Sequence, residues 1–130
     1  HATIENCYFS GSANSALSSV YVGGANATIV QCYSTLSAYG VYVNASNCCA
    51  KSNTLHGTET GFFSATAARG RYSENDCKGA TTGSNPRALV VSDATDYSVI
   101  VGNVIPSGET GYKKQNNNQF AANIGTYTVA

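Results

Sequence analysis

The densest group of charged side chains in the sequence lies between residues 59 and 78. Its members are Glu59, Arg69, Arg71, Glu74, Asp76 and Lys78. Glu59, Glu74 and Asp76 are candidate catalytic residues, because a pair of carboxylates can hydrolyse a glycosidic bond, one as the acid and the other as nucleophile or base. The plainer interpretation is a solvated charged surface, with Arg69 and Arg71 as part of it. The sequence leaves both open.

Aromatic residues recur in a second pattern. The segments Val20-Tyr21-Val22, Val41-Tyr42-Val43 and Phe62-Phe63-Ser64 lie at the same phase, 21 residues apart. If these are strands with Val20 and Val22 inside, then Tyr21, Tyr42 and Phe63 form an outward column, and Tyr8 and Tyr33 form a second outward pair. Exposed aromatic rings at this density need a cover. We consider a subunit contact, sugar stacked on the rings, or a loop of the same chain; if the phase is wrong, the rings are core.

Cysteine and histidine do not indicate a metal site. The five cysteines, Cys7, Cys32, Cys48, Cys49 and Cys77, contain no CxxC pair and no histidine at ligand spacing. We therefore predict buried free thiols, no bound metal and no cofactor. His56, followed by Gly57, is predicted to be a surface turn residue and not a catalytic base.

Composition excludes several classes of partner. The formal net charge is zero and Lys113-Lys114 is the only adjacent basic pair, so a nucleic-acid groove is unsupported. Apolar runs are far shorter than the roughly 20 residues that cross a bilayer, which predicts no membrane insertion. The chain is rich in Gly, Ser, Thr, Asn, Ala and Val and lacks Met and Trp, so strands and turns are expected in place of helices.

A repeat organises the chain. The following segments align without gaps: Ile4-Glu-Asn-Cys7-Tyr-Phe9, Ile29-Val-Gln-Cys32-Tyr-Ser34, Ala50-Lys-Ser-Asn53-Thr-Leu55, Tyr72-Ser-Glu-Asn75-Asp-Cys77 and Ile100-Val-Gly-Asn103-Val-Ile105. In each, an apolar residue stands three positions before a Cys or Asn anchor. In four of them another apolar residue stands two positions after it, Ser34 being the exception. The anchors lie 21 to 28 residues apart, which is the period of one solenoid coil.

This repeat predicts an all-β parallel β-helix of about five coils over residues 1–108, followed by a polar loop and a C-terminal cap or strand segment over 109–130. An antiparallel sandwich is the alternative. The predicted inward columns are Ile4/Ile29/Ala50/Tyr72/Ile100 and Phe9/Ser34/Leu55/Cys77/Ile105. The Asn anchors are expected to bond the corner backbone and each other, and Asn suits a repeated turn position because it tolerates left-handed geometry. Cys7 and Cys32 would continue their column as small buried residues.

The segments Ile4-Glu-Asn-Cys-Tyr-Phe-Ser-Gly11 and Tyr39-Gly-Val-Tyr-Val43 resemble the repeats of the right-handed parallel β-helix family related to pectate lyases. Phage tailspikes and tail-fibre appendages share this architecture. The resemblance covers roughly residues 2–108 and implies the right-handed fold. It also implies a second chemistry for residues 59–78, in which carboxylates and an arginine hold calcium and abstract a proton. No catalytic motif of the family matches residue by residue.

From this resemblance we expect a segment of a tailspike-like or tail-fibre-like protein, extracellular or on a virion surface. It would contact bacterial surface polysaccharide as a homotrimer. One alternative is a monomeric polysaccharide lyase or glycoside hydrolase that uses the charged cluster. Another is the spacer of a bacterial adhesin or passenger domain. The fold hosts all three, so it does not choose among them.

Overall fold

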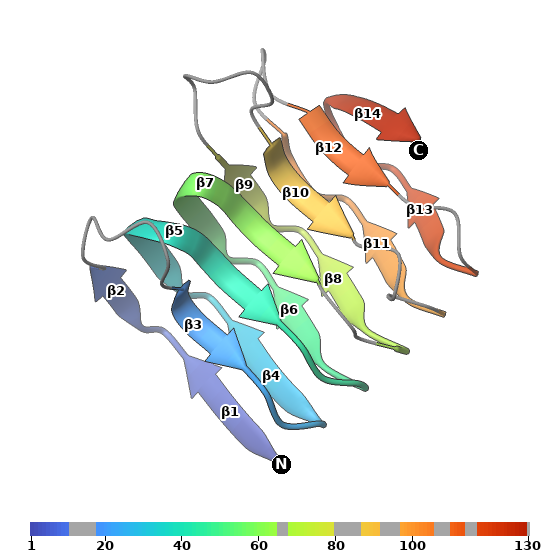
Figure 1. Ribbon diagram of the computed structural model, residues 1–130. Helices are drawn as coiled ribbons and strands as arrows, with labels where there is room; N and C mark the ends of the chain where they lie inside the picture. The colour runs from blue at the N-terminus through green and yellow to red at the C-terminus, as the bar shows by residue number, and fades with distance from the viewer. Residues whose placement is uncertain are drawn as a thin grey trace.

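The computed structural model describes residues 1–10, 18–64, 68–79, 87–91, 97–105, 110–113 and 117–129 (Figure 1). For residues 36, 58, 59, 63, 110–113 and 126–129 only the backbone is described. The protein is an all-β parallel solenoid, as predicted, and the described residues contain no helix. It has about four turns, so the prediction of about five coils is approximate.

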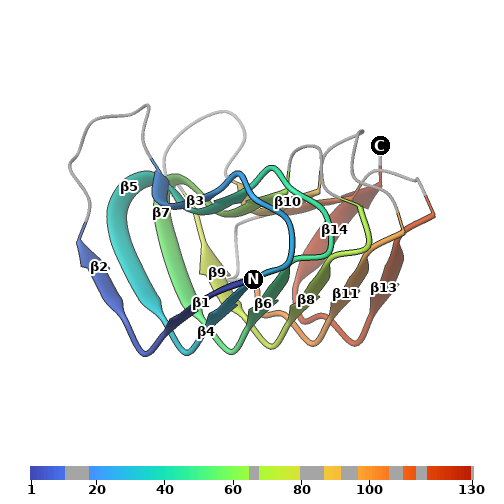
Figure 2. The same cartoon turned by 90° about the horizontal axis from the view of Figure 1, so that it is seen from below.

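Two parallel sheets form the walls of the solenoid. The first is six-stranded, in the order β1 (Ala2–Glu5), β4 (Ala27–Val30), β6 (Cys49–Lys51), β8 (Arg71–Ser73), β11 (Val99–Val101) and β13 (Gln119–Ala121). The second contains β2 (Tyr8–Ser10), β3 (Ser18–Val22), β5 (Tyr33–Val43), β7 (Thr54–Ser64), β9 (Asp76–Lys78), β10 (Arg87–Val91), β12 (Thr110–Lys113) and β14 (Thr126–Val129). The ribbons of β5 and β7 curve around one side of the coil (Figure 2). Their curvature lets one sheet supply two sides of the core.

The predicted inward columns are confirmed by the strand pairing. Ile4 pairs with Ile29, Ile29 with Ala50, Ala50 with Tyr72 and Tyr72 with Ile100. Phe120, which we did not predict, extends this column through its pairing with Ile100. In the second column the pairs are Phe9 with Ser34, Ser34 with Leu55 and Leu55 with Cys77, and Ile105 is buried in the same core. The apolar side of each strand is therefore closed by the coils above and below it.

Tyr72 is the largest side chain in its column and is fully buried. Its ring turns back over Gly70, where a Cβ would lie within 2.2 Å of the phenol oxygen, and it packs on Phe62 at a centroid distance of 4.6 Å. Burial raises the pKa of Tyr72 to about 12, partly opposed by the hydrogen bond from Ser64. Two small residues make room for the ring: Ala50, which is next to Tyr72 in the column, and Gly70, which has no side chain.

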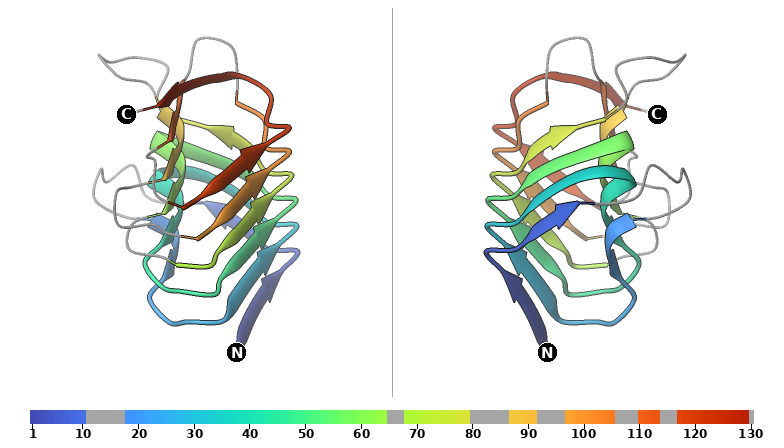
Figure 3. Two further views of the ribbon diagram at one scale, coloured as in Figure 1. Left: turned by 90° about the vertical axis from the view of Figure 1, so that its right-hand side faces the viewer. Right: turned by 90° about the vertical axis from the view of Figure 1, so that its left-hand side faces the viewer.

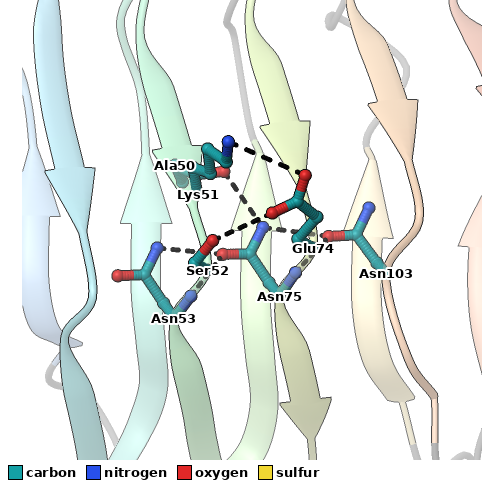
Figure 4. A network of polar contacts seen from close by, with 7 residues as sticks. All are labelled: Ala50, Lys51, Ser52, Asn53, Glu74, Asn75 and Asn103. Atoms are coloured by element: carbon teal, nitrogen blue, oxygen red, sulfur yellow. Dashed lines mark hydrogen bonds and ion pairs between the residues drawn. The ribbon is translucent and has the colours of Figure 1, made fainter.

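The anchors form a continuous ladder of asparagine side chains (Figure 4). Asn53 Nδ2 donates to Asn75 Oδ1, Asn75 Nδ2 to Asn103 Oδ1, and Asn103 Nδ2 to Asn123 Oδ1, each at 2.9 Å. Each Nδ2 also donates to a backbone carbonyl of the preceding coil, as Asn75 does to Ala50 at 3.0 Å. Each Oδ1, that of Asn53 included, accepts a bond from the backbone N–H of the anchor before it. The predicted Asn–Asn and Asn–backbone bonds are confirmed.

The left-handed corner belongs to a different residue from the anchor. Positive φ angles occur at the position before each anchor: Asn6 (53°), Gln31 (52°), Ser52 (54°), Glu74 (56°), Gly102 (65°) and Ala122 (50°). The anchors themselves are not in this region. The corner residue turns the backbone, and the anchor that follows can then direct its amide into the stack. The tolerance of Asn for left-handed geometry is therefore not the reason that Asn occupies the anchor position.

The five cysteines are free thiols, as predicted, but not all are buried. Cys32, Cys48 and Cys77 are buried, Cys49 is half-buried and Cys7 is exposed. Cys32 follows the anchor pattern, because its Sγ lies 3.7 Å from the carbonyl oxygen of Ile4, the position that an Asn amide occupies in later coils. The prediction of burial fails for Cys7 because it lies in the first coil, with a neighbouring described coil on one side only.

Residues 109–130 were predicted as a polar loop and a cap or strand segment. The described residues there include β12, β13 and β14, in which β13 pairs in parallel with β11 and β14 with β12. Asn123 also joins the asparagine ladder. The coil pattern therefore continues to residue 129.

Candidate functional site

The first aromatic column on the outer surface starts at Tyr8. Tyr8 pairs with Tyr33, Tyr33 with Thr54 and Thr54 with Asp76, and bridges continue the column to Val104 and Ile124. The Tyr8 and Tyr33 rings stack with centroids 5.2 Å apart and an angle of 5°. Their exposed fractions are 66% and 37%. The predicted outward pair is therefore present.

This stacking limits what the rings can bind. Parallel rings one coil apart cover each other's faces, which leaves the outer face of Tyr8, the ring edges and the phenol oxygens for a ligand. The edge of the cluster is extended by His56, whose ring meets that of Tyr33 in an edge contact at 5.5 Å. His56 pairs with Lys78 in the next coil. It lies inside β7 and not in a turn, so the predicted turn position was wrong.

The second aromatic column starts at Tyr21, which pairs with Tyr42, and Tyr42 pairs with Phe63. The Tyr21 and Tyr42 rings lie 5.5 Å apart, and Tyr39 meets Tyr42 in an edge contact at 5.3 Å. Tyr21 is 61% exposed and its hydroxyl accepts a hydrogen bond from Asn44 Nδ2 at 3.1 Å. The backbone places Phe63 in the predicted column, but its side chain lies outside the described residues.

The second column is covered at one level by the chain itself. Val90 follows Phe63 in the column, yet only 3% of its surface is exposed. A subunit contact, a sugar and a loop of the same chain were the three groups that could cover this column. At Val90 the same chain provides the cover. Tyr21, at the start of the column, has no comparable cover, so a ligand or a second chain has access to it.

The charged residues of the predicted cluster are distributed over different parts of the coil. Glu74 lies at the exposed corner, where its carboxylate accepts a hydrogen bond from Ser52 Oγ at 3.1 Å and lies 3.7 Å from Lys51 Nζ (Figure 4). Asp76 is exposed in β9, in the Tyr8 column. The inward Asn75 separates these two carboxylates.

The two arginines lie at the other end of β8 from Glu74. Arg71 is exposed at the start of β8, and Arg69 precedes it with a φ of 56°. Glu59 is part of β7, but its side chain lies outside the described residues. Arg69, Arg71 and Glu74 lie on an exposed corner and strand surface. Asp76 lies in the Tyr8 column, one coil beyond Thr54, and Lys78 pairs with His56.

In the described parts of the chain, no group of three or more His, Cys, Asp or Glu side chains is arranged to hold a metal ion. No described helix is long and apolar enough to span a membrane.

Comparison with known proteins gave no relatives. No family model matches the chain, and neither the curated proteins nor the solved structures that were searched gave a match. What the structure itself supports is a parallel β-solenoid, consistent with a β-helix fold.

Proposed function

We propose that this protein is a β-helical segment of an extracellular appendage, such as a phage tailspike or tail fibre, that contacts bacterial surface polysaccharide. The observation that carries the proposal is the exposed Tyr8–Tyr33 stack on a wall of parallel strands. Tyrosine supplies a rigid, amphipathic contact surface at a low cost in conformational entropy. A solenoid keeps such a surface in a fixed place.

The polar surroundings of the rings suit a sugar. Thr54 and Asp76 continue the column below Tyr33, and His56 and Lys78 lie beside it. Thr54 and His56 offer a hydroxyl and an imidazole next to Tyr33, and Asp76 and Lys78 add a carboxylate and an ammonium group one coil further along. All four can form hydrogen bonds to sugar hydroxyls. Carbohydrate contact needs this combination of an apolar patch with convergent polar groups.

Binding can be tested with the purified chain on an array of bacterial surface polysaccharides, followed by titration of any glycan that binds. We expect Tyr8→Ser and Tyr33→Ser each to weaken binding by about tenfold, which corresponds to about 1.4 kcal/mol. Tyr97→Ser is the matched control, because Tyr97 is an exposed tyrosine (62%) outside both columns. Binding that is unchanged in both column variants, or no binding to any glycan, would contradict the proposal.

The same proposal includes a side-by-side homotrimer that uses the Tyr21, Tyr42 and Phe63 column. Its support is the exposure of Tyr21 together with the enrichment of aromatic residues at subunit contacts. Light scattering should then give three times the monomer mass at all dilutions, and Tyr42→Ser should dissociate the trimer. A mass that Tyr42→Ser leaves unchanged would argue against this contact.

A further inference from the structure

One wall of the solenoid carries two neighbouring columns of outward side chains. β2, the start of β5, the start of β7 and β9 follow one another along this wall (Figure 3). Thr54 and Asp76 belong to the Tyr33 column. Two residues further along the same strands stand His56 and Lys78. Residues two apart on a strand face the same side of a sheet, so these five side chains share one surface.

The two basic residues of this surface lie beside each other in adjacent coils. His56 pairs with Lys78, so their backbones are about 4.8 Å apart, the spacing of paired strands. Lys78 is exposed and forms no ion pair with any described residue, whereas Lys51 on the other sheet lies 3.7 Å from Glu74. The His56 ring meets the Tyr33 ring in an edge contact at 5.5 Å. An imidazole and an unpaired ammonium group are thus available beside one aromatic ring.

On the basis of the proposed function, in which this wall contacts polysaccharide, we further propose that the polysaccharide is acidic. His56 and Lys78 bind its carboxylate or phosphate group, and the attached sugar ring lies against Tyr33. Both basic side chains can donate hydrogen bonds, and bonds to an ionised acceptor are shorter and stronger than those to a neutral one. Two donors in adjacent coils can bond two oxygens of the same anion.

Asp76 limits where the acidic group can lie. It is exposed and stands two residues before Lys78 on β9, and the two side chains form no ion pair. A carboxylate accepts hydrogen bonds and disfavours a second negative charge nearby. Asp76 and the hydroxyl of Thr54, with which it pairs, are therefore placed to bond sugar hydroxyls. The acidic group is directed away from them, toward His56.

The basic side chains hold the acidic group without a bridging metal ion. The family resemblance implied calcium held by carboxylates and an arginine. Arg71 and Glu74, however, lie on β8 and at the corner beyond it, away from this wall. No group of three or more His, Cys, Asp or Glu side chains in the described ranges is arranged to hold a metal ion. Binding of an acidic glycan should therefore persist in EDTA.

The preference can be measured with a bacterial polysaccharide that contains uronic acid and with the same polymer after reduction of its carboxyl groups to neutral alcohols. We expect the acidic form to bind about fivefold more tightly, the size expected of charge pairs at an exposed site. Higher salt should reduce this difference. A phosphate-containing polysaccharide, tested before and after removal of its phosphate groups, shows which of the two anions is preferred.

A pair of lysine variants locates the preference. Lys78→Gln should remove most of the preference for the acidic form. Lys51→Gln is the matched control, because it removes the same charge from β6 on the other sheet and should retain the preference. Equal losses in the two variants would mean that general charge attraction is responsible, which would overturn the assignment to this surface.

Asp76→Asn gives a test of the opposite sign. Asparagine keeps a hydrogen-bonding side chain and removes the repulsion, so affinity for the acidic form should rise about twofold. Glu74→Gln makes the same change of charge at the corner and should leave that affinity unchanged. A fall in affinity for the acidic form in Asp76→Asn would contradict the proposed position of the acidic group.

The same titrations separate failure of the ligand class from failure of the proposed function. Equal affinity for the acidic and neutral forms of both polymers, with binding weakened by Tyr33→Ser, would overturn the acidic ligand and leave polysaccharide contact in place. Binding of none of the forms would contradict the proposed function and the acidic ligand together. Binding that is lost in EDTA would show that a divalent cation bridges the acidic group, and would overturn its direct contact with Lys78.

Discussion

The side chains of Asn75 and Asn103 are joined by a 2.9 Å hydrogen bond that runs from one coil to the next, in the fully buried part of the ladder. Asn75 Oδ1 also accepts from both the backbone N–H and the side-chain amide of Asn53. One amide therefore satisfies buried groups on both sides of its own coil. This makes the ladder positions the most sensitive polar sites in the chain.

Asn75→Ala should destabilise the protein by about 3 kcal/mol or more, because two donors of Asn53 lose their acceptor, at about 1 to 3 kcal/mol for each buried unsatisfied group. Chemical denaturation measures the change. Gln119→Ala, which removes an exposed amide in β13, is the control and should change stability by no more than about 0.5 kcal/mol. Equal effects of the two substitutions would mean that the ladder adds no stability beyond that of a surface amide.

Gly70→Ala should cost about 1 to 3 kcal/mol, because the new Cβ would overlap the Tyr72 phenol. If this overlap is the cause, the cost should shrink when Tyr72 is replaced by Ile, the residue type found at positions 29 and 100 of the same column. A double-mutant cycle with Tyr72→Ile measures this coupling. Strictly additive free energies would show that Gly70 is needed for another reason.

The Tyr72 phenol makes stability depend on alkaline pH. Burial raises its pKa from 10.0 to about 12, so between these values the unfolded chain releases the proton while the folded chain retains it. Fewer bound protons in the unfolded state mean that stability falls as pH rises, by up to about 1.4 kcal/mol per pH unit. Denaturation curves at pH 9, 10.5 and 12 should show this decline, and it should be weaker in Tyr72→Phe. Equal declines in both proteins would exclude Tyr72 as its source.

Ser34→Ala should stabilise the protein by about 1 kcal/mol. The Ser34 hydroxyl is buried and has no hydrogen-bond partner among the described residues, so its removal ends a desolvation cost without breaking a bond. Ser37→Ala is the contrasting variant, since the Ser37 hydroxyl accepts a 2.9 Å bond from Ser19. Ser37→Ala should be neutral or destabilising. Thermal unfolding of both variants checks the sign, and a loss of stability in Ser34→Ala would contradict the expectation.

The repeat made the core predictable because a solenoid requires similar side chains at the same phase of every coil. The Ile29 and Leu55 columns follow directly from that rule. The exposure of Cys7 does not, since phase alone does not distinguish this anchor from Cys32, which has a described coil on each side. The left-handed corner at Glu74 could not be predicted, because Asn75 beside it is the residue type that more often adopts this geometry, whereas here its amide is needed inside the stack.

The outer surface was only partly predictable. Alternation within strands placed Tyr8 over Tyr33 and Tyr21 over Tyr42 correctly. The charged cluster was harder to foresee, because its members are close in sequence but the chain turns a corner between Arg71 and Asp76. His56 was misplaced because Gly57 suggests a turn, whereas β7 continues through it. Local residue types cannot reveal such an extended, curved strand.

The asparagine ladder has a direction. Every side-chain bond along it donates from the coil nearer the N-terminus to the coil nearer the C-terminus, from Asn53 to Asn123. The amide dipoles therefore add along the axis, as peptide dipoles do in an α-helix. Removing the coil of Asn123 would take the shared side-chain acceptor from two donors of Asn103, whereas removing the coil of Cys7 would take from the side chain of the next anchor, Cys32, only its contact with the Ile4 carbonyl. Opening of the ladder should consequently cost less free energy on the Cys7 side than on the Asn123 side.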